Sequence, residues 1–327
     1  MTDSSATNVA TPADSSTPAS RSRRMDIVNG VLVGLLIVAL FGVNFVVDPY
    51  DANRVFDLGL EKRDVTAKLN YFNWKFAQYR ADPKPVILLG DSRVDAWPIE
   101  PFEQALGKQT FNFGFGGGTS LDAFDAFWFA VELGKVERVY LALNLAILDD
   151  AMQRNPAKKA RQLLDQPVQY YLSPSITRAT TKVVGHAMAE ALATSEKPPM
   201  NVDEFWKHQL EAWDRITGEH YKKPTKIMAE LRKVAAHCKE KGIKLQLVLN
   251  PTHADVAAMR KKRGLDKHWD SLKSELAKVA PTYDFDWAGP LTENRANFGD
   301  PFHLATAPVK STIDQVLAGK GPDLVRL

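Results

Sequence analysis

The segment VILLGDSRV places a serine directly after a short apolar run. Val86 to Leu89 has the pattern of a buried strand, and the turn that follows presents Ser92. Near the other end of the chain, FGDPFHL carries Asp300 and His303, three residues apart. A serine hydroxyl is a weak nucleophile until a base accepts its proton, and a carboxylate can hold that base in the useful tautomer. The three side chains predict attack on an ester carbonyl: Ser92 attacks, His303 relays the proton and Asp300 orients His303.

A glycine-rich segment, FNFGFGGGTS, can supply hydrogen-bond donors for the oxyanion that such an attack creates. Backbone N–H groups of glycines are accessible because no side chain blocks the approach. Each piece also has an ordinary explanation, since Ser92 and Asp95 match a helix-capping pair and Gly116 to Gly118 matches a flexible turn. The combination, in this chain order, favours the catalytic interpretation. An α/β-hydrolase elbow, G-x-S-x-G, is disfavoured because Val94 stands where its last glycine belongs.

These blocks resemble those of the SGNH (GDSL-type) hydrolase superfamily, which has an early GDS block and a late DxxH block. The resemblance covers residues 84 to about 318. Laid on the second block of the family, N-x-G-x-S-G-D-T, the coinciding residues are Asn112, Gly114, Gly117 and Thr119. The resemblance implies an oxyanion hole made of the Ser92 and Gly117 N–H groups and the Asn144 side chain. The glycine and aspartate that accompany this asparagine in the third block of the family are absent here.

Further polar residues fall where the substrate is expected. Arg93 follows the nucleophile directly, and Asn250 and His253 follow an apolar run in VLNPTHAD. All three are candidate substrate contacts, although a histidine at this place can equally cap a turn. Asp149 and Asp150 lie beyond the end of another predicted strand, and we expect both to be solvated loop carboxylates.

Apolar runs alternate with helical patterns along the chain, which is typical of parallel βαβ units. The predicted strands are 86–89, 110–113, 138–143, 243–249 and 283–287, and the predicted helices are 119–134, 222–241, 265–279 and one from about 306. The fold class is therefore α/β, and the resemblance implies a three-layer flavodoxin-like parallel sheet. Ligands of such sheets bind at the carboxyl ends of the strands. The residues expected at those ends are Ser92, Gly117, Asn144 and Asn250.

The remaining segments suggest how the chain is divided. Residues 1–26 are rich in Ser, Thr, Ala and Pro and are predicted to be a disordered tail. Residues 27–47 carry no charge and are long enough to cross a hydrocarbon layer of about 30 Å as one transmembrane helix. Residues 48–83 are predicted to be a juxtamembrane segment that packs on an α/β domain spanning 84–327. A helical insertion at about 149–221 interrupts that domain, and its aromatic residues are expected in the core.

The charges that flank the apolar segment predict its orientation. Arg21, Arg23 and Arg24 precede it, whereas Asp48 and Asp51 follow it, so the tail should stay cytoplasmic and the domain should be extracytoplasmic at a bacterial inner membrane. A cleaved signal peptide is the competing interpretation, but FVVDPYDA has no small-residue cleavage pattern. A buried core helix is disfavoured because the run has no amphipathic face.

Composition excludes several classes of function. The net charge of +3 gives no indication of nucleic-acid binding. Cys238 is the only cysteine, so it cannot form an intramolecular disulfide, and we expect it to pack in a helix rather than bind a metal. We predict no metal and no cofactor.

Membrane-anchored proteins that this chain resembles suggest an O-acyltransferase that acetylates an envelope or secreted polysaccharide. Its partners would be an acyl donor or a membrane-bound protein that delivers the acyl group, the polysaccharide and the membrane. A carbohydrate esterase or deacetylase would use the same residues. A third hypothesis is a catalytically inactive glycan-binding or scaffold protein of a polysaccharide assembly, which the incomplete third block favours.

Overall fold

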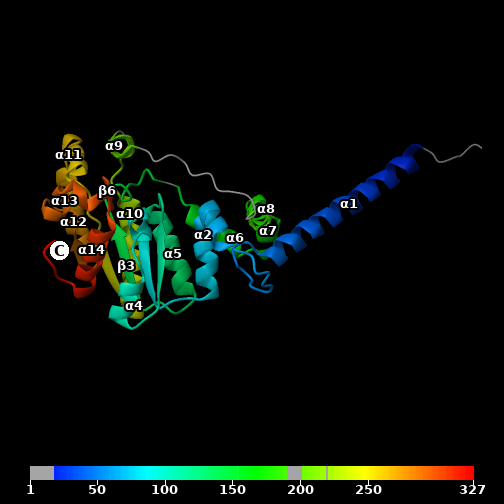
Figure 1. Ribbon diagram of the computed structural model, residues 1–327, viewed down its shortest axis with the longest axis horizontal. Helices are drawn as coiled ribbons and strands as arrows, with labels where there is room; N and C mark the ends of the chain where they lie inside the picture. Colours follow the sequence, from blue (N-terminus) through cyan, green and yellow to red (C-terminus); the bar gives the residue numbers. More distant parts are fainter. Residues whose placement is uncertain (1–17, 153, 190–200, 219) are drawn as a thin grey trace, which may run out of the picture.

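A six-stranded sheet lies at the centre of the computed structural model, which describes residues 18–152, 154–189, 201–218 and 220–327 (Figure 1). In the order in which they pair, the strands are β2 (Thr110–Phe115), β1 (Val86–Asp91), β3 (Arg138–Leu143), β4 (Lys244–Leu249), β5 (Thr282–Asp284) and β8 (Val325–Arg326). The first five are parallel, and β8 pairs antiparallel with β5. The predicted α/β fold is confirmed, with one added antiparallel edge strand.

Helices cover both faces of the sheet, because alternate residues of each parallel strand are buried on opposite sides. On one face, Ile87 and Leu89 share a core with α2 (Arg63–Ala81), α5 (Ser120–Glu132), α10 (Thr225–Lys241) and α12 (Asp266–Val279). On the other face, Val86 and Leu88 share a core with α3 (Ser92–Asp95), α4 (Glu100–Leu106), α13 (Pro290–Glu293) and α14 (Thr306–Ala318). The result is a three-layer arrangement.

The order of the strands determines where a ligand can bind. The sequence β2-β1-β3-β4-β5 is the flavodoxin-like order, in which the chain changes direction between β1 and β3. A crevice forms at such a switch point, outside the carboxyl ends of the strands. Ser92 directly follows β1 and Asn144 directly follows β3, so both lie at this point.

Helices also form most of the described part of 149–221, the stretch predicted as a helical insertion. They are α6 (Pro156–Leu164), α7 (Pro167–Leu172), α8 (Pro174–Ala189) and α9 (Val202–Gly218). Trp206 and Trp213 of α9 are buried as expected, while Phe205 is partly buried. Figure 1 shows α9 close to α11 (Ala254–Lys262) on one side of the sheet, whereas α6, α7 and α8 lie between α2 and the amino-terminal helix.

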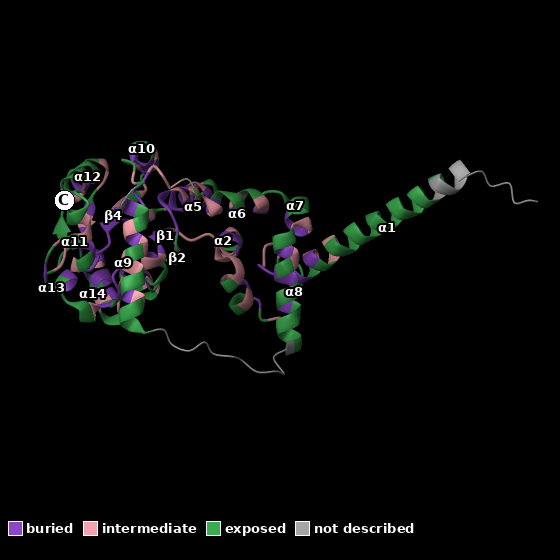
Figure 2. Cartoon of the chain, turned by 90° about the horizontal axis from the view of Figure 1, so that it is seen from above, coloured by how far each residue is buried: buried purple, intermediate pink, exposed green. Residues whose placement is uncertain are grey.

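That helix, α1 (Pro18–Val47), projects away from the rest of the molecule and is exposed along most of its length (Figure 2). Its segment Met25–Val47 is long and apolar enough to cross a membrane. The last turn is different, because Asn44 is buried and its Nδ2 donates to the Tyr171 carbonyl at 2.6 Å and to Thr177 Oγ1 at 3.0 Å. The helix begins at Pro18, inside the stretch predicted to be disordered, and residues 1–17 lie outside the described part of the chain.

Candidate active site

Ser92, His303 and Asp300 form a continuous hydrogen-bonded relay. The Ser92 Oγ lies 2.6 Å from His303 Nε2, and His303 Nδ1 lies 2.7 Å from Asp300 Oδ2. Since a carboxylate can only accept, His303 is assigned the tautomer with its proton on Nδ1, which leaves Nε2 free to accept from the serine hydroxyl. The structure therefore brings together the three residues that were predicted to form a proton relay, although 211 positions separate Ser92 from His303.

A short hairpin made of β6 (Phe298–Asp300) and β7 (His303–Leu304) holds the acid and the base. Asp300 Oδ1 accepts the N–H groups of Phe302 at 2.9 Å and His303 at 3.1 Å, which leaves Oδ2 to face the imidazole. Burial alone would raise the pKa of the Asp300 carboxyl. The hydrogen bond and charge of His303, together with the two backbone N–H groups, outweigh it and hold that pKa below its ordinary value. Asp300 is therefore ionised wherever the imidazole works as a base.

Ser92 is the first residue of α3, and the residue before it caps this helix. Asp91 Oδ1 accepts the Arg93 N–H at 3.0 Å, so the capping role that the sequence left open for Ser92 belongs to Asp91. The Ser92 hydroxyl is thus free to meet His303. Its N–H is the first amide of a helix and has no acceptor within that helix, as an oxyanion donor requires.

Two residues of the glycine-rich segment hold α3 against the sheet. At Gly114 an added Cβ would lie only 2.1 Å from the Asp95 nitrogen, so only glycine lets the backbone of α3 approach β2 this closely. Asn112 Nδ2 donates to the carbonyls of Val94 at 2.7 Å and Trp97 at 2.9 Å. These contacts fix the helix that carries the nucleophile.

The turn after β2 contains Gly117, the predicted oxyanion donor. Gly117 is exposed and has a φ of +63°, a left-handed conformation that favours glycine. The register of β1 with β2 pairs Asp91 with Phe115, so this turn emerges at the same edge as Ser92. The Gly117 carbonyl accepts from Arg154 Nη2 at 2.5 Å, and the Gly116 carbonyl accepts from the Tyr71 hydroxyl. Both carbonyls are thus held by side chains from other parts of the chain.

Asn144 lies at the expected place but its amide has other partners. The side chain is buried, and Oδ1 accepts the N–H groups of Ala146 at 3.0 Å and Ile147 at 3.2 Å. Nδ2 donates to Asp91 Oδ2 at 2.8 Å. Asn144 therefore ties the end of β3 to the residue that precedes Ser92. Its role in the oxyanion hole stays a prediction, and only its second amide hydrogen can serve it.

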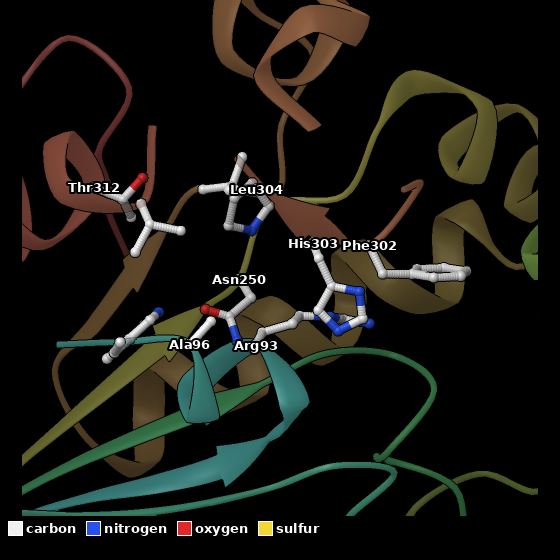
Figure 3. A pocket seen from close by; sticks show the side chains of 10 residues that line it. Arg93, Ala96, Asn250, Phe302, His303, Leu304 and Thr312 are labelled. Carbon is white, nitrogen blue, oxygen red and sulfur yellow. The ribbon is translucent and has the colours of Figure 1, made fainter. Parts of the chain in front are cut away.

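Arg93 and Asn250 lie together in a pocket beside the relay, and His303 forms part of the pocket wall (Figure 3). His253 is not among the residues that line this pocket. It is only 7% exposed, its Nδ1 accepts the Asp255 N–H at 3.1 Å, and its N–H donates to the Pro301 carbonyl at 3.0 Å. The substrate contact considered for His253 is therefore replaced by a structural role: it caps α11 and supports the turn between Asp300 and His303.

The expectation that Asp149 and Asp150 are solvated loop carboxylates is wrong for Asp149, whereas Asp150 is partly exposed. Asp149 is 1% exposed, and its Oδ1 accepts the N–H groups of Ala151 and Lys222, both at 2.8 Å. Asp150 accepts the N–H groups of Lys226 at 2.8 Å and Ile227 at 3.0 Å, in the first turn of α10. Both satisfy backbone donors that are distant in sequence, which no local pattern reveals.

The Cys238 thiol does not compete with Ser92 as a nucleophile. Burial raises the pKa of the Cys238 thiol to about 12, so it is a packing residue rather than a nucleophile. Among the described residues, no group of three or more His, Cys, Asp and Glu side chains is arranged to hold a metal ion.

No protein-family model matches the chain, and no curated protein matches its sequence. Solved structures with a similar fold include a protein proposed to be an acylhydrolase from Bacteroides fragilis NCTC 9343, at 15% identity and a TM-score of 0.40 over 76% of this chain and 98% of the other. A GDSL-like lipase from Bacteroides thetaiotaomicron VPI-5482 has 13% identity and a TM-score of 0.37 over 76% and 98% of the two chains. A protein proposed to be a lipolytic member of the G-D-S-L family, from Desulfitobacterium hafniense DCB-2, has 12% identity and a TM-score of 0.36 over 71% and 97%. Likenesses this distant carry no information about activity, so function has to be inferred from the side chains.

Proposed function

We propose that this chain is a membrane-anchored serine enzyme of the SGNH type that transfers or hydrolyses an acyl ester through an acyl-serine intermediate. The observation that carries the proposal is the relay from Ser92 through His303 to Asp300, with contacts of 2.6 and 2.7 Å. A catalytically inactive scaffold would have no need for this geometry at the switch point of the sheet.

The reaction follows from the contacts. The Ser92 Oγ attacks the ester carbonyl and passes its proton to His303 Nε2, while Asp300 stabilises the imidazolium that forms. The N–H groups of Ser92 and Gly117, with a contribution from Asn144, would bind the oxyanion. The C–O bond to the leaving alcohol then breaks as His303 returns the proton to that alcohol, which leaves acyl-Ser92. A second alcohol completes a transfer, and water completes a hydrolysis.

We infer that α1 is a permanent anchor and that the domain is extracytoplasmic. The arginines before the span support this orientation. The buried last turn of α1 supports retention of the helix, because cleavage after Val47 would remove the Asn44 contacts with Tyr171 and Thr177. A signal peptide is discarded and has no reason to pack into the mature domain.

The favoured reaction is O-acetylation of an extracytoplasmic polysaccharide, with acetyl groups supplied by a membrane-bound partner. Anchoring supports this choice, because it keeps the serine close to a donor in the same membrane. A carbohydrate esterase or deacetylase is the alternative.

The proposal is tested with the full-length protein in detergent, an aryl acetate as donor and an oligosaccharide as acceptor. We expect acetylated saccharide to form at the expense of free acetate, equally in wild type and in Ser274→Ala, an exposed serine of α12. Ser92→Ala should form neither product. If the rate of acetate release does not change when the oligosaccharide is added, the protein is an esterase rather than a transferase. Normal turnover by Ser92→Ala would refute serine catalysis.

A further inference from the structure

The pocket beside the relay contains an unusual concentration of unsatisfied donors. Six buried side-chain nitrogen and oxygen atoms lack a hydrogen-bond partner in the described part of the chain, and three of them lie here. They are Arg93 Nε, Arg93 Nη1 and Asn250 Nδ2. Buried polar groups are normally paired, so such a group of them needs an explanation.

Both side chains are well buried. The Arg93 side chain is 10% exposed and Asn250 is 2% exposed. Much of the surrounding wall is apolar, with Trp97, Leu304 and Val309 among its residues. Asn250, Arg93 and His303 line the same pocket (Figure 3). A ligand group bound here would therefore lie beside the catalytic base.

The charge of Arg93 is balanced only in part. Asp91 Oδ2 lies 3.8 Å from Arg93 Nε, too far for a hydrogen bond. Both Asp91 oxygens already accept from other groups, Oδ1 from the Arg93 N–H and Oδ2 from Asn144. Phe302 packs against the guanidinium with its ring centroid 5.6 Å from Cζ, and it cannot accept like an oxygen. The guanidinium keeps two donors for a ligand.

The chemistry of the missing partner follows from this donor set. All three atoms without a partner are hydrogen-bond donors, and the Arg93 guanidinium is a permanent cation. A carboxylate brings a negative charge and two acceptor oxygens, one for the guanidinium and one for the Asn250 amide, so it matches this set of donors better than a hydroxyl or a neutral carbonyl does. We propose that the substrate carries a carboxylate, which binds Arg93 and Asn250 while its ester lies at Ser92.

This inference rests on the proposed function and narrows its substrate. The carboxylate can belong to either side of the ester. It is on the acyl side if the donor is the half-ester of a dicarboxylic acid, so that the acyl group passed to Ser92 keeps a free carboxylate, and on the alcohol side if the acceptor is an acidic sugar. The recognition is the same in both cases, so the experiment separates the two sources.

The test uses full-length protein in detergent and matched pairs of probes. For the acyl side, an aryl hemisuccinate is compared with the aryl methyl succinate. For the alcohol side, glucuronic acid is compared with glucose as acceptor of acetyl from a neutral aryl acetate. We expect one of these two pairs to show a preference for the carboxylate of about tenfold or more in kcat/KM, as expected where a buried site is built to pair with one group.

Three variants connect that preference to the pocket. Arg93→Met should reduce it to near unity, whereas Arg93→Lys, which keeps the charge but not the fork, should retain part of it. Asn250→Asp places a negative charge against the carboxylate and should reverse the preference. Thermal unfolding of each variant establishes that it is folded.

The outcomes separate this inference from the proposed function. If neutral probes acylate Ser92 but neither pair shows a preference, the inference is wrong and the proposed function stands. If Arg93→Met lowers turnover of charged and neutral probes by the same factor, Arg93 serves the reacting carbonyl, and the carboxylate site is again refuted. If no probe acylates the protein in a Ser92-dependent way, the proposed function itself fails.

Discussion

Asp300 uses one oxygen to hold its own turn and the other to orient the base, so its substitution tests the relay. Asp300→Asn keeps the shape, but the side-chain amide can donate to His303 Nδ1 and favour the tautomer that protonates Nε2. We expect kcat to fall by about 10³- to 10⁴-fold with little change in KM. Steady-state hydrolysis of an aryl acetate measures this effect. A loss of less than about tenfold would mean that the tautomer of His303 does not limit the reaction.

The Asp300 carboxyl also makes the unfolding free energy depend on pH. Its pKa is lower in the folded protein because His303 and two backbone N–H groups outweigh the effect of burial. Such a group stabilises the fold above the ordinary carboxyl pKa of about 3.9, and this contribution is lost as the pH falls through the folded value. The difference in unfolding free energy between wild type and Asp300→Asn should therefore shrink below about pH 4. Urea unfolding at a series of pH values checks this, and a difference that stays constant into acid would contradict it.

Asn144 can act directly on the oxyanion or only through Asp91. Direct donation predicts that Asn144→Ala lowers kcat by about 10²- to 10³-fold. Asp91→Ala removes the same 2.8 Å hydrogen bond but keeps the Asn144 amide, so it should cost less. Kinetics of both single variants and the double variant form a cycle that separates the two roles. An equal loss of kcat in the two single variants and the double variant would show that Asn144 only positions Asp91.

At the scale of elements, α2 connects the amino-terminal part of the chain to the site. Lys75 of α2 is buried, and its Nζ donates to Asp95 Oδ1 at 2.6 Å and to the Gly114 carbonyl. Burial lowers the pKa of this amine, and the charge of Asp95 opposes that effect. One side chain thus holds α2, α3 and β2 together.

Lys75→Met should leave Asp95 and the Gly114 carbonyl without this donor. We expect a loss of about 1 to 3 kcal/mol in unfolding free energy, the usual range for a buried group left unsatisfied, together with a lower kcat. Lys68→Met is the matched control, because Lys68 lies on the same helix and is exposed. Chemical denaturation and aryl acetate kinetics of both variants provide the comparison. Equal stabilities for the two variants would show that Lys75 does not hold α3.

Apolar patterns predicted the existence of the main strands better than their ends. The strand expected at 86–89 extends to Asp91, because Gly90 and Asp91 pair with Gly114 and Phe115 of the neighbouring strand. The strand expected at 283–287 instead ends at Asp284. Where a strand ends depends on how far the neighbouring strand continues to pair with it, and the residues of the strand give no local signal for that. The hairpin β6–β7 and strand β8 are too short to show a period of two.

The candidate site was predicted to the extent that its residues stand in recognisable blocks. Ser92, Asp300 and His303 come together as expected. The residues that support them were not predicted, because their partners are distant in sequence: Lys75 reaches Gly114, and Tyr71 reaches Gly116. A lysine or tyrosine on a partly apolar helix gives no sign of such a contact. Only the packing of α2 on the sheet creates it.

At the scale of the whole molecule, the end of α1 is built into the domain. Asp48 follows the helix directly, is fully buried, and accepts the N–H groups of Ala52 at 3.0 Å, Asn53 at 2.9 Å and Arg54 at 3.0 Å. With the Asn44 contacts, this gives α1 a defined direction relative to the crevice. A flexible tether would leave that direction open.

The proposed orientation places the carboxyl end outside the cytoplasm. A reporter that is active only outside the cytoplasm, fused after Leu327, should give signal, and a reporter that is active only in the cytoplasm should not. Replacing Arg21, Arg23 and Arg24 with Glu is expected to reduce the first signal, because the positive flank determines the topology. The opposite reporter pattern would refute the orientation. A mature protein shortened by residues 1 to 47 would refute the anchor.

The central claim is that Ser92 carries the acyl group, and intact-mass analysis tests it most directly. Full-length protein in detergent is mixed with an excess of an aryl acetate and quenched in acid during the first turnover. We expect a mass increase of one acetyl group, located on the peptide that contains Ser92, in wild type and in Ser274→Ala but not in Ser92→Ala. An acetyl group that persists in Ser92→Ala, or a wild-type protein that turns over the ester without ever gaining the mass, would contradict the account.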